Sequence, residues 1–311
     1  PGRSGRGWGR ELVAYVNTGY GLAPRGIRCF DYETEELVWE HDTGAAVREV
    51  VVSDLDGDGN KEIIFGTAAV GNRNVAPDGT SDRASYICAL SHEGEPLWVA
   101  VLGPQSTSVT PIPVDFDKDG KHEILAWVES DPIWTRQPPP VVLLDAEGDL
   151  LRRYDPEELL TDCRIAEVGP GRSTVVLLAD QSGTCHVLDT DLTLLAPHQI
   201  VISPYDHVEL FIGDATDLDG DGDVELVFSA TEREDIETDN PGYASRPKNV
   251  FVYHNNQVIV LDELFKPEST VMLSQRWKEH VPIGIEVGPF LPGGGNGLFV
   301  LADKASLMAI S

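Results

Sequence analysis

Three stretches of the chain repeat one pattern: VVVSDLDGDGNKEIIF at 50–65, PIPVDFDKDGKHEIL at 111–125 and FIGDATDLDGDGDVELVF at 211–228. Each stretch has a run of apolar residues, then a short loop rich in Asp, then a second apolar run. Short apolar runs on both sides of a turn are typical of antiparallel β-strands. Repetition of such a unit along one chain indicates a repeat architecture.

A second pattern accompanies these stretches. The segment at 85–103, SYICALSHEGEPLWVAVLG, has two apolar runs around a Gly-containing turn, and GIRCFDYETEELVWEHDTG at 26–44 matches it. We therefore expect a unit of four short strands, two around the Asp-rich loop and two in a hairpin. Further hairpin copies lie at 141–155, 185–195 and 250–264, and two units that lack the Asp-rich loop lie at 165–180 and 283–310.

This unit predicts an all-β protein, a β-propeller of four-stranded blades, because blades arranged in a ring hide their apolar faces against one another. A linear β-solenoid is the alternative, but its repeats are usually shorter. Six repeats are recognisable and the pattern leaves room for seven; the first lacks its first strand and the last lacks its fourth. We treat residues 1–311 as a single domain, with repeats at about 11–44, 45–103, 104–155, 156–200, 201–266 and 267–311.

The three Asp-rich loops share the spacing D-x-D-x-D-G-x-x-E, and we call them the first, second and third acidic loops, residues 54–62, 115–123 and 217–225. Ca2+ takes about six to eight oxygen ligands, and alternate residues of a tightly curled loop can direct carboxylates at one centre. Gly in the sixth position permits a sharp turn, and the seventh residue offers its backbone carbonyl. The predicted ligands are Asp54, Asp56, Asp58, Asn60, Glu62, Asp115, Asp117, Asp119, Lys121, Glu123, Asp217, Asp219, Asp221, Asp223 and Glu225.

The acidic loops differ from an EF-hand, whose closing Glu comes at position twelve before a helix. Here the closing Glu is the ninth residue and an apolar strand-like run follows. Asp and Gly also form ordinary turns, but that explanation suits one such loop better than three. Mg2+ fits less well because it prefers rigid octahedral sites and keeps its water. We predict about three Ca2+ ions with a structural role, since the clustered carboxylates repel one another without a cation.

Loops and repeats together resemble the FG-GAP/VCBS repeat family, which includes the integrin α-subunit propellers. The resemblance extends from about Glu11 to Ile310, and the acidic loop followed by a strand carries it, whereas the FG-GAP tripeptides survive only as remnants such as Phe65-Gly66 and Gly103-Pro104. It implies Ca2+ at the acidic loops, and integrin propellers have seven blades. Family members include adhesion proteins, secreted carbohydrate-active proteins and sensor domains of bacterial receptors, so the resemblance does not select a function.

The net charge is −29, and no basic stripe interrupts the acidic composition. Such a surface repels nucleic acid, which excludes DNA and RNA as partners. No run of 18 or more apolar residues occurs, so we expect no membrane insertion within this chain. Loops of this kind suit the millimolar calcium outside cells, and we expect a periplasmic, secreted or cell-surface location.

No G-x-S-x-G, H-E-x-x-H or G-x-x-x-x-G-K-[ST] motif occurs in the sequence. We therefore predict no catalytic residue and no organic cofactor. The expected function is a binding, adhesion or scaffold module for protein or carbohydrate. A polysaccharide lyase and the sensor domain of a larger bacterial receptor are the alternatives.

A partner is expected on the face opposite the acidic loops, where the second and third strands of each blade are connected. Four of these connections are long, at Asn17–Arg25, Thr67–Ala84, Val128–Pro140 and Ala230–Lys248. Long loops on a rigid scaffold often bind ligands, although they can also be merely variable. Aromatic and Arg side chains suit protein or sugar surfaces. The candidate contacts are Tyr20, Asn72, Arg73, Asp131, Trp134, Arg136, Arg233, Tyr243 and Arg246.

The four cysteines show neither a C-x-x-C pair nor zinc-site spacing. Three of them fall inside short apolar runs. Buried free thiols are the main expectation, and a disulfide is the alternative. The residues concerned are Cys29, Cys88, Cys163 and Cys185.

Overall fold

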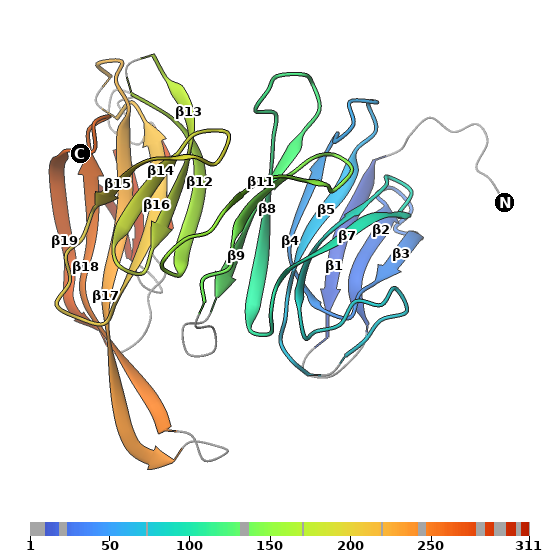
Figure 1. Cartoon of the computed structure of the whole chain (residues 1–311), viewed down its shortest axis with the longest axis horizontal. Helices are drawn as coiled ribbons and strands as arrows, with labels where there is room; N and C mark the ends of the chain where they lie inside the picture. The colour runs from blue at the N-terminus through green and yellow to red at the C-terminus, as the bar shows by residue number, and fades with distance from the viewer. Residues whose placement is uncertain are drawn as a thin grey trace. The chain divides into compact units, whose positions relative to one another are not determined.

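The computed structural model describes residues 10–18, 24–72, 74–130, 137–169, 171–218, 220–241, 247–277, 284–288, 297–302 and 306–310. The regular elements in these ranges are β-strands, drawn in Figure 1. Across the same ranges we find no helix with the length and apolar character needed to cross a bilayer. The chain divides into two compact units, Pro1–Leu159 and Leu160–Ser311, which we call the first and second units.

The first unit consists of antiparallel meanders. Its first three strands, β1, β2 and β3, form a three-stranded sheet, whereas β4 to β7 and β8 to β11 form two four-stranded meanders joined by the single pair Ala68–Ser108. The strands are β1 (Glu11–Asn17), β2 (Arg25–Asp31), β3 (Leu37–Asp42), β4 (Ala46–Ser53), β5 (Glu62–Ala68), β6 (Ser85–Leu90), β7 (Pro96–Gly103), β8 (Thr107–Val114), β9 (Glu123–Ser130), β10 (Val141–Leu144) and β11 (Leu150–Tyr154).

The second unit repeats the same design. Two four-stranded meanders, β12 to β15 and β16 to β19, precede a three-stranded sheet of β20, β21 and β22. The strands are β12 (Leu160–Val168), β13 (Ser173–Asp180), β14 (Thr184–Leu188), β15 (Leu194–Gln199), β16 (His207–Thr216), β17 (Glu225–Pro241), β18 (Pro247–Leu261), β19 (Pro267–Trp277), β20 (Gly284–Gly288), β21 (Gly297–Ala302) and β22 (Ser306–Ile310). Four-stranded antiparallel sheets are therefore the building unit, as predicted.

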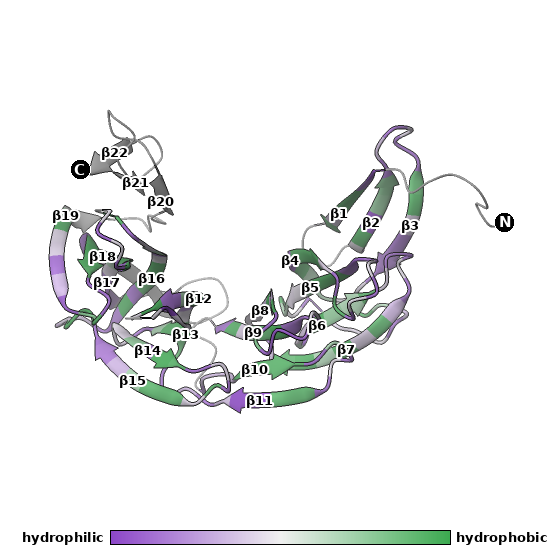
Figure 2. Ribbon diagram, turned by 90° about the horizontal axis from the view of Figure 1, so that it is seen from above, coloured by the Kyte–Doolittle hydropathy of each residue, from purple (hydrophilic) through white to green (hydrophobic). Residues whose placement is uncertain are grey.

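The hydrophobic core lies between neighbouring sheets. One cluster in the first unit joins Ile64 and Ile87 of one meander to Ile124 and Val142 of the next. The second and third strands of a meander are covered on both faces, so β5 and β6 are buried along their whole length. Outer strands such as β7 alternate exposed and half-buried residues. Figure 2 shows the apolar residues running along inner strands such as β10 and β14.

Tryptophans dock neighbouring sheets of the first unit onto each other. The indole N–H of Trp39 on β3 donates to the carbonyl of His92, and that of Trp98 on β7 donates to the carbonyl of Ala146, at 2.9 Å in the second case. Each ring lies against the glycine of the same turn, Gly148 for Trp98. A side chain on an outer strand thus fastens one meander to the hairpin turn of the next.

In the second unit a stacked pair takes the corresponding place. The ring of His198 on β15 stacks on Phe265, in the turn between β18 and β19, with ring centroids 4.0 Å apart and an interplanar angle of 10°. Phe265 has a φ of 61°, so its backbone adopts the left-handed conformation that glycines adopt in the turns of the first unit. Both units therefore have a contact between an outer strand and the hairpin turn of the next sheet. In the first unit it is a Trp hydrogen bond, and in the second it is a ring stack.

The prediction of a loop at Ala230–Lys248 is wrong for the residues that the structure describes in this range. Strand β17 continues to Pro241 and pairs with β18 from Pro247 onward, which gives the long hairpin at the bottom of Figure 1. The segment from Thr231 to Thr238 contains a run of four charged residues, Glu232–Asp235, between Thr231 and Ile236. Threonine and isoleucine favour strands, and the charges between them masked that signal.

All four cysteines are buried, as expected. Burial raises the pKa of the Cys29 thiol to about 12, and the neighbouring Glu11 carboxylate adds to the rise. A thiol so disfavoured as thiolate is a poor nucleophile at neutral pH, and these residues act as small apolar side chains.

Candidate metal centre

The first acidic loop connects β4 to β5 and curls around its own first carboxylate. Asp54 accepts the backbone N–H groups of Gly57 at 2.9 Å and Gly59 at 3.0 Å. As a result the carboxylate oxygens of Asp54, Asp56 and Asp58 lie within 4.8 Å of one another. Three hard oxygen donors gathered this closely fit a cation such as Ca2+.

The second acidic loop, between β8 and β9, is built in the same way. Asp115 accepts the N–H groups of Asp119 and Gly120, each at 3.2 Å. Here Asp115, Asp117 and Glu123 offer carboxylate oxygens within 4.8 Å of one another. The donor set again consists of hard oxygens, although a different trio of acids is brought together.

The third acidic loop connects β16 to β17 in the second unit. Asp217 accepts the N–H groups of Gly220 at 2.6 Å and Gly222 at 3.0 Å, which repeats the scheme of the first loop. The glycine at the sixth position has φ +93°, +89° and +99° in the three loops, so the predicted sharp turn is present. Asp219 lies outside the described residues, and its place as a ligand stays a prediction.

The ninth residue closes each loop through the backbone. One side-chain oxygen of Glu62 accepts the N–H of Leu55 at 2.8 Å. The same bond joins Glu123 to Phe116 and Glu225 to Leu218. This bond ties the start of the loop to the strand that leaves it.

Electrostatics in the first loop favour a cation. Burial raises the pKa of Glu62, and the Asp56 and Asp58 carboxylates add to that rise, although the N–H of Leu55 opposes it. Backbone and side-chain N–H groups of Asn60 lower the pKa of Asp58. A bound cation would offset the repulsion that acts on Glu62.

The seventh residue of each loop donates its N–H to the fifth, from Asn60 to Asp58, Lys121 to Asp119 and Asp223 to Asp221, at 2.7, 2.8 and 2.9 Å. These bonds hold the fifth carboxylate in place. The predicted role of the seventh carbonyl as a ligand stays a prediction.

His122 links the first two loops, which sequence reasoning missed. It belongs to the second loop, but its Nδ1 lies 2.8 Å from the carbonyl oxygen of Asp54 and 3.1 Å from Oγ of Ser53. Its backbone N–H donates to the carbonyl of Leu55 at 3.1 Å. No spacing rule signals this contact because it joins two repeats that are distant in sequence.

On the predicted ligand face only Asn72 and Arg233 fall within the described residues. Tyr20, Arg73, Asp131, Trp134, Arg136, Tyr243 and Arg246 lie outside them.

The connection that carries Asn72 is anchored internally. Its backbone N–H donates to Asp82, which is fully buried and also accepts the N–H of Asn74. The same carboxylate pairs with the buried guanidinium of Arg25 at 3.4 Å. This segment therefore supports the sheet beneath it, a role that sequence reasoning missed.

Arg233 differs from the exposed contact that the sequence analysis expects. It lies on β17, is 8% exposed, and forms ion pairs with Asp235 at 2.9 Å and Glu209 at 3.5 Å. The cause is the continuation of β17, which places residue 233 in a sheet rather than in a loop. Its guanidinium joins β17 to Glu209 on β16 near the point where the long hairpin begins.

Comparison with known proteins supports the fold. No family model and no curated protein matches the chain. Among solved structures, the Dos1 propeller has a TM-score of 0.52 at 15% identity, covering 91% of this chain and 61% of that chain. A quinohemoprotein alcohol dehydrogenase from Pseudomonas putida HK5 has 0.50 at 14%, covering 92% and 55%. A europium-containing methanol dehydrogenase has 0.50 at 12%, covering 96% and 66%.

At these identities the likeness concerns the fold alone, and the chain spans less than two thirds of each of these three structures. The sheets described above and this likeness together identify a β-propeller of four-stranded blades, which confirms the predicted fold class. Two of the three structures are dehydrogenases, so propellers of this kind include enzymes.

Proposed function

We propose that this protein is a calcium-stabilised β-propeller of the FG-GAP/VCBS type that serves outside the cytoplasm as a binding, adhesion or scaffold module. The observation that carries the proposal is the recurrence of one hydrogen-bond scheme in three loops of the same spacing. In each loop the first Asp accepts two backbone N–H groups and the ninth Glu accepts another. Hard oxygens arranged in this way suit Ca2+ better than softer metals.

The metal has a structural task in this proposal. Each acidic loop joins two strands of one sheet, so a bound ion would fix the turn from which the next strand leaves. The carboxylates named in the sequence analysis would hold it. The extracytoplasmic location follows from calcium supply, since sites of modest affinity fill only where calcium is millimolar.

The partner surface remains the face opposite the acidic loops. Arg233 is committed to ion pairs within the sheet, so Trp134 and Arg136 are the contacts on which we place most weight. A protein or a carbohydrate would suit aromatic and Arg side chains. Replacing both residues by Ala should abolish binding of a true partner, whereas unchanged binding would contradict this placement.

Removal of metal tests the calcium proposal. Metal analysis should find about three Ca2+ ions per chain, and EDTA should lower the melting temperature on the order of 10–20 °C, because each filled site at about 100 times its Kd adds about 2.7 kcal/mol. Calcium should restore the stability.

A matched pair of variants sharpens this test. A chain carrying Asp54→Asn, Asp115→Asn and Asp217→Asn should bind less metal and respond little to EDTA. Asp155→Asn, which changes an exposed carboxylate paired with Arg153, should behave like the wild type. Absence of bound metal together with no EDTA response would show that the loops are only turns.

A further inference from the structure

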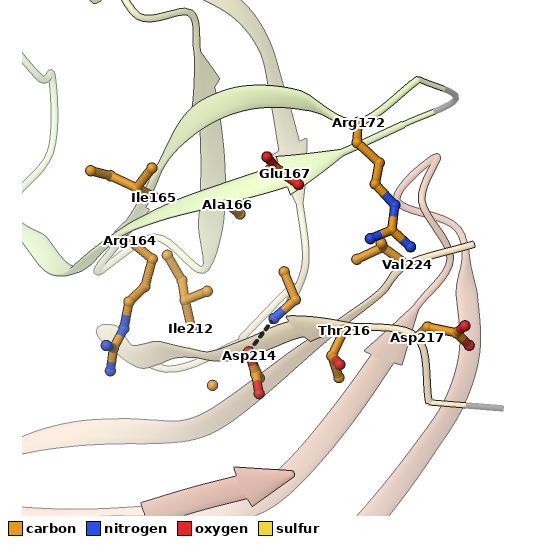
Figure 3. A pocket seen from close by; sticks show the side chains of 12 residues that line it. Arg164, Ile165, Ala166, Glu167, Arg172, Ile212, Asp214, Thr216, Asp217 and Val224 are labelled. Carbon is orange, nitrogen blue, oxygen red and sulfur yellow. Dashed lines mark hydrogen bonds between the residues drawn. The ribbon is translucent and has the colours of Figure 1, made fainter. Parts of the chain in front are cut away.

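A pocket of about 430 Å3 lies in the second unit, between β12 and β16 and beside the third acidic loop. Figure 3 shows the side chains that line it. Its apolar part includes three buried residues, Ala166, Ile212 and Val224. The volume falls within the range of about 300–1,000 Å3 that is usual for small-molecule sites.

Charged groups of both signs surround this apolar part. Arg164 and Arg172 lie at opposite ends of the pocket, as Figure 3 shows, and Glu167 and Asp214 are exposed along it. The hydroxyl of Thr216 adds a group that can both donate and accept. The lining of the pocket therefore offers both hydrogen-bond donors and hydrogen-bond acceptors.

Two local irregularities of the backbone lie at this pocket. The pairing of β16 with β17 shifts register between Ile212 and Asp214, which is typical of a β-bulge beside Asp214. Arg172 has a φ of 51°, which is unusual for a residue with a side chain. Bulges and left-handed residues are concentrated near functional sites.

Hydrogen bonds fix the pocket at both ends. At one end the carboxylate of Asp162 accepts the backbone N–H of Ile212 at 2.9 Å, which joins β12 to β16. At the other end Arg172 donates to the carbonyl of Gly222 in the third acidic loop at 3.2 Å. The walls are thus held together before any ligand arrives, which lowers the entropic cost of binding.

We propose that this pocket binds a neutral polyhydroxylated ligand, that is, a saccharide unit. An anion would meet the carboxylates of Glu167 and Asp214 within a chain of net charge −29. A cation would meet the guanidinium groups of Arg164 and Arg172. A hydroxyl group donates and accepts at once, so a polyol satisfies both kinds of partner without burying an unpaired charge.

This site goes beyond the proposed function, because it lies beside an acidic loop and not on the opposite face. It can therefore be tested separately from Trp134 and Arg136. The carboxylate of Asp217 already serves the acidic loop, so Arg164, Asp214 and Glu167 are the charged groups left to contact a ligand in this proposal.

The test begins with an array of neutral glycans and the wild-type chain in the presence of calcium. The best glycan is then titrated calorimetrically against Arg164→Ala and Asp214→Asn. Each variant should weaken binding about tenfold or more, since each removes a hydrogen bond to a charged group. Arg153→Ala, which removes an exposed arginine of the first unit, should leave the affinity unchanged.

Three results would overturn the proposal. The first is the absence of any neutral glycan that binds. The second is that a glycan binds both variants as well as it binds the wild type, whereas replacing Trp134 and Arg136 by Ala abolishes its binding. That result would support the opposite face instead. The third is that free amino acids or dipeptides bind and glycans do not, and that both variants weaken this binding. That result would show that the pocket binds a zwitterion. Melting curves identical to the wild type show that the variants are folded.

Discussion

The first and second acidic loops lie against each other, whereas the third lies beside a turn that has no acidic loop. His122 connects the first pair through the carbonyl of Asp54, and Arg172 approaches the third loop through the carbonyl of Gly222. The internal hydrogen bonds of all three loops are nevertheless alike. The nine-residue spacing therefore determines the loop itself, and the neighbouring repeat determines what supports it.

The two units also differ in how neighbouring sheets are fastened. Trp98 docks on the turn of Gly148 in the first unit, while His198 stacks on Phe265 in the second. A tryptophan needs a turn without a side chain, whereas a flat imidazole accepts an aromatic ring beneath it. The same junction has thus two chemical solutions, and substitutions can separate them.

Among substitutions that test these comparisons, Gly148→Ala should have the largest effect. A Cβ at Gly148 would lie 2.6 Å from Cδ2 of Trp98, and the residue has φ +82°. The strained φ costs about 1–2 kcal/mol and the overpacking about 1–3 kcal/mol. The melting temperature should fall by roughly 5–15 °C, measured by calorimetry.

Gly79→Ala is the matched control, because Gly79 has φ +86° but no atom within 4 Å of the added Cβ. It should show only the cost of the backbone conformation, about 1–2 kcal/mol. Equal losses for the two variants would mean that the contact with Trp98 contributes nothing to the junction.

His122→Ala should have an intermediate effect, confined to the paired loops. Loss of its contacts to Ser53 and Asp54 should weaken calcium binding at the first loop about five- to tenfold, because roughly one hydrogen bond is lost. The third loop should keep its affinity. Calcium titrations of chains in which a single loop retains its acids can measure each site.

The control for His122 is Lys61→Ala, which changes the residue at the same position of the first loop, where the side chain is exposed. Calcium affinity should not change there. If His122→Ala also weakened the third loop, the effect would be a general loss of stability and not a link between neighbouring loops.

The sequence predicts the repeated sheet well because that prediction depends on local signals. Apolar runs on both sides of an Asp-rich loop define β4 and β5 without any knowledge of their neighbours. The same holds for the sixth-position glycine, whose positive φ follows from the sharp turn. The three acidic loops could therefore be located from spacing alone.

Contacts between repeats could not be predicted in this way. His122 reaches Asp54 across 68 positions of the chain, and Asp82 reaches Arg25 across 57, so no local pattern announces either contact. The hairpin of β17 and β18 was missed because the run of four charged residues at 232–235 resembles a loop. The pocket beside the third loop depends on a bulge and a left-handed Arg172, which single-sequence reasoning does not reveal.

The smallest effect should come from protonation of His198, in the second unit, when the pH falls. Burial against Phe265 lowers the pKa of His198 below its usual value of about 6.5. The folded chain then holds this proton less tightly than the unfolded chain, so stability is lost as the pH falls below about 6.5 toward the folded pKa. Between pH 7.5 and pH 5, the melting temperature of the wild type should fall slightly more than that of His198→Gln. Equal losses would show that protonation of His198 does not weaken its stack on Phe265, and the second junction would then be as insensitive to pH as the Trp98 junction.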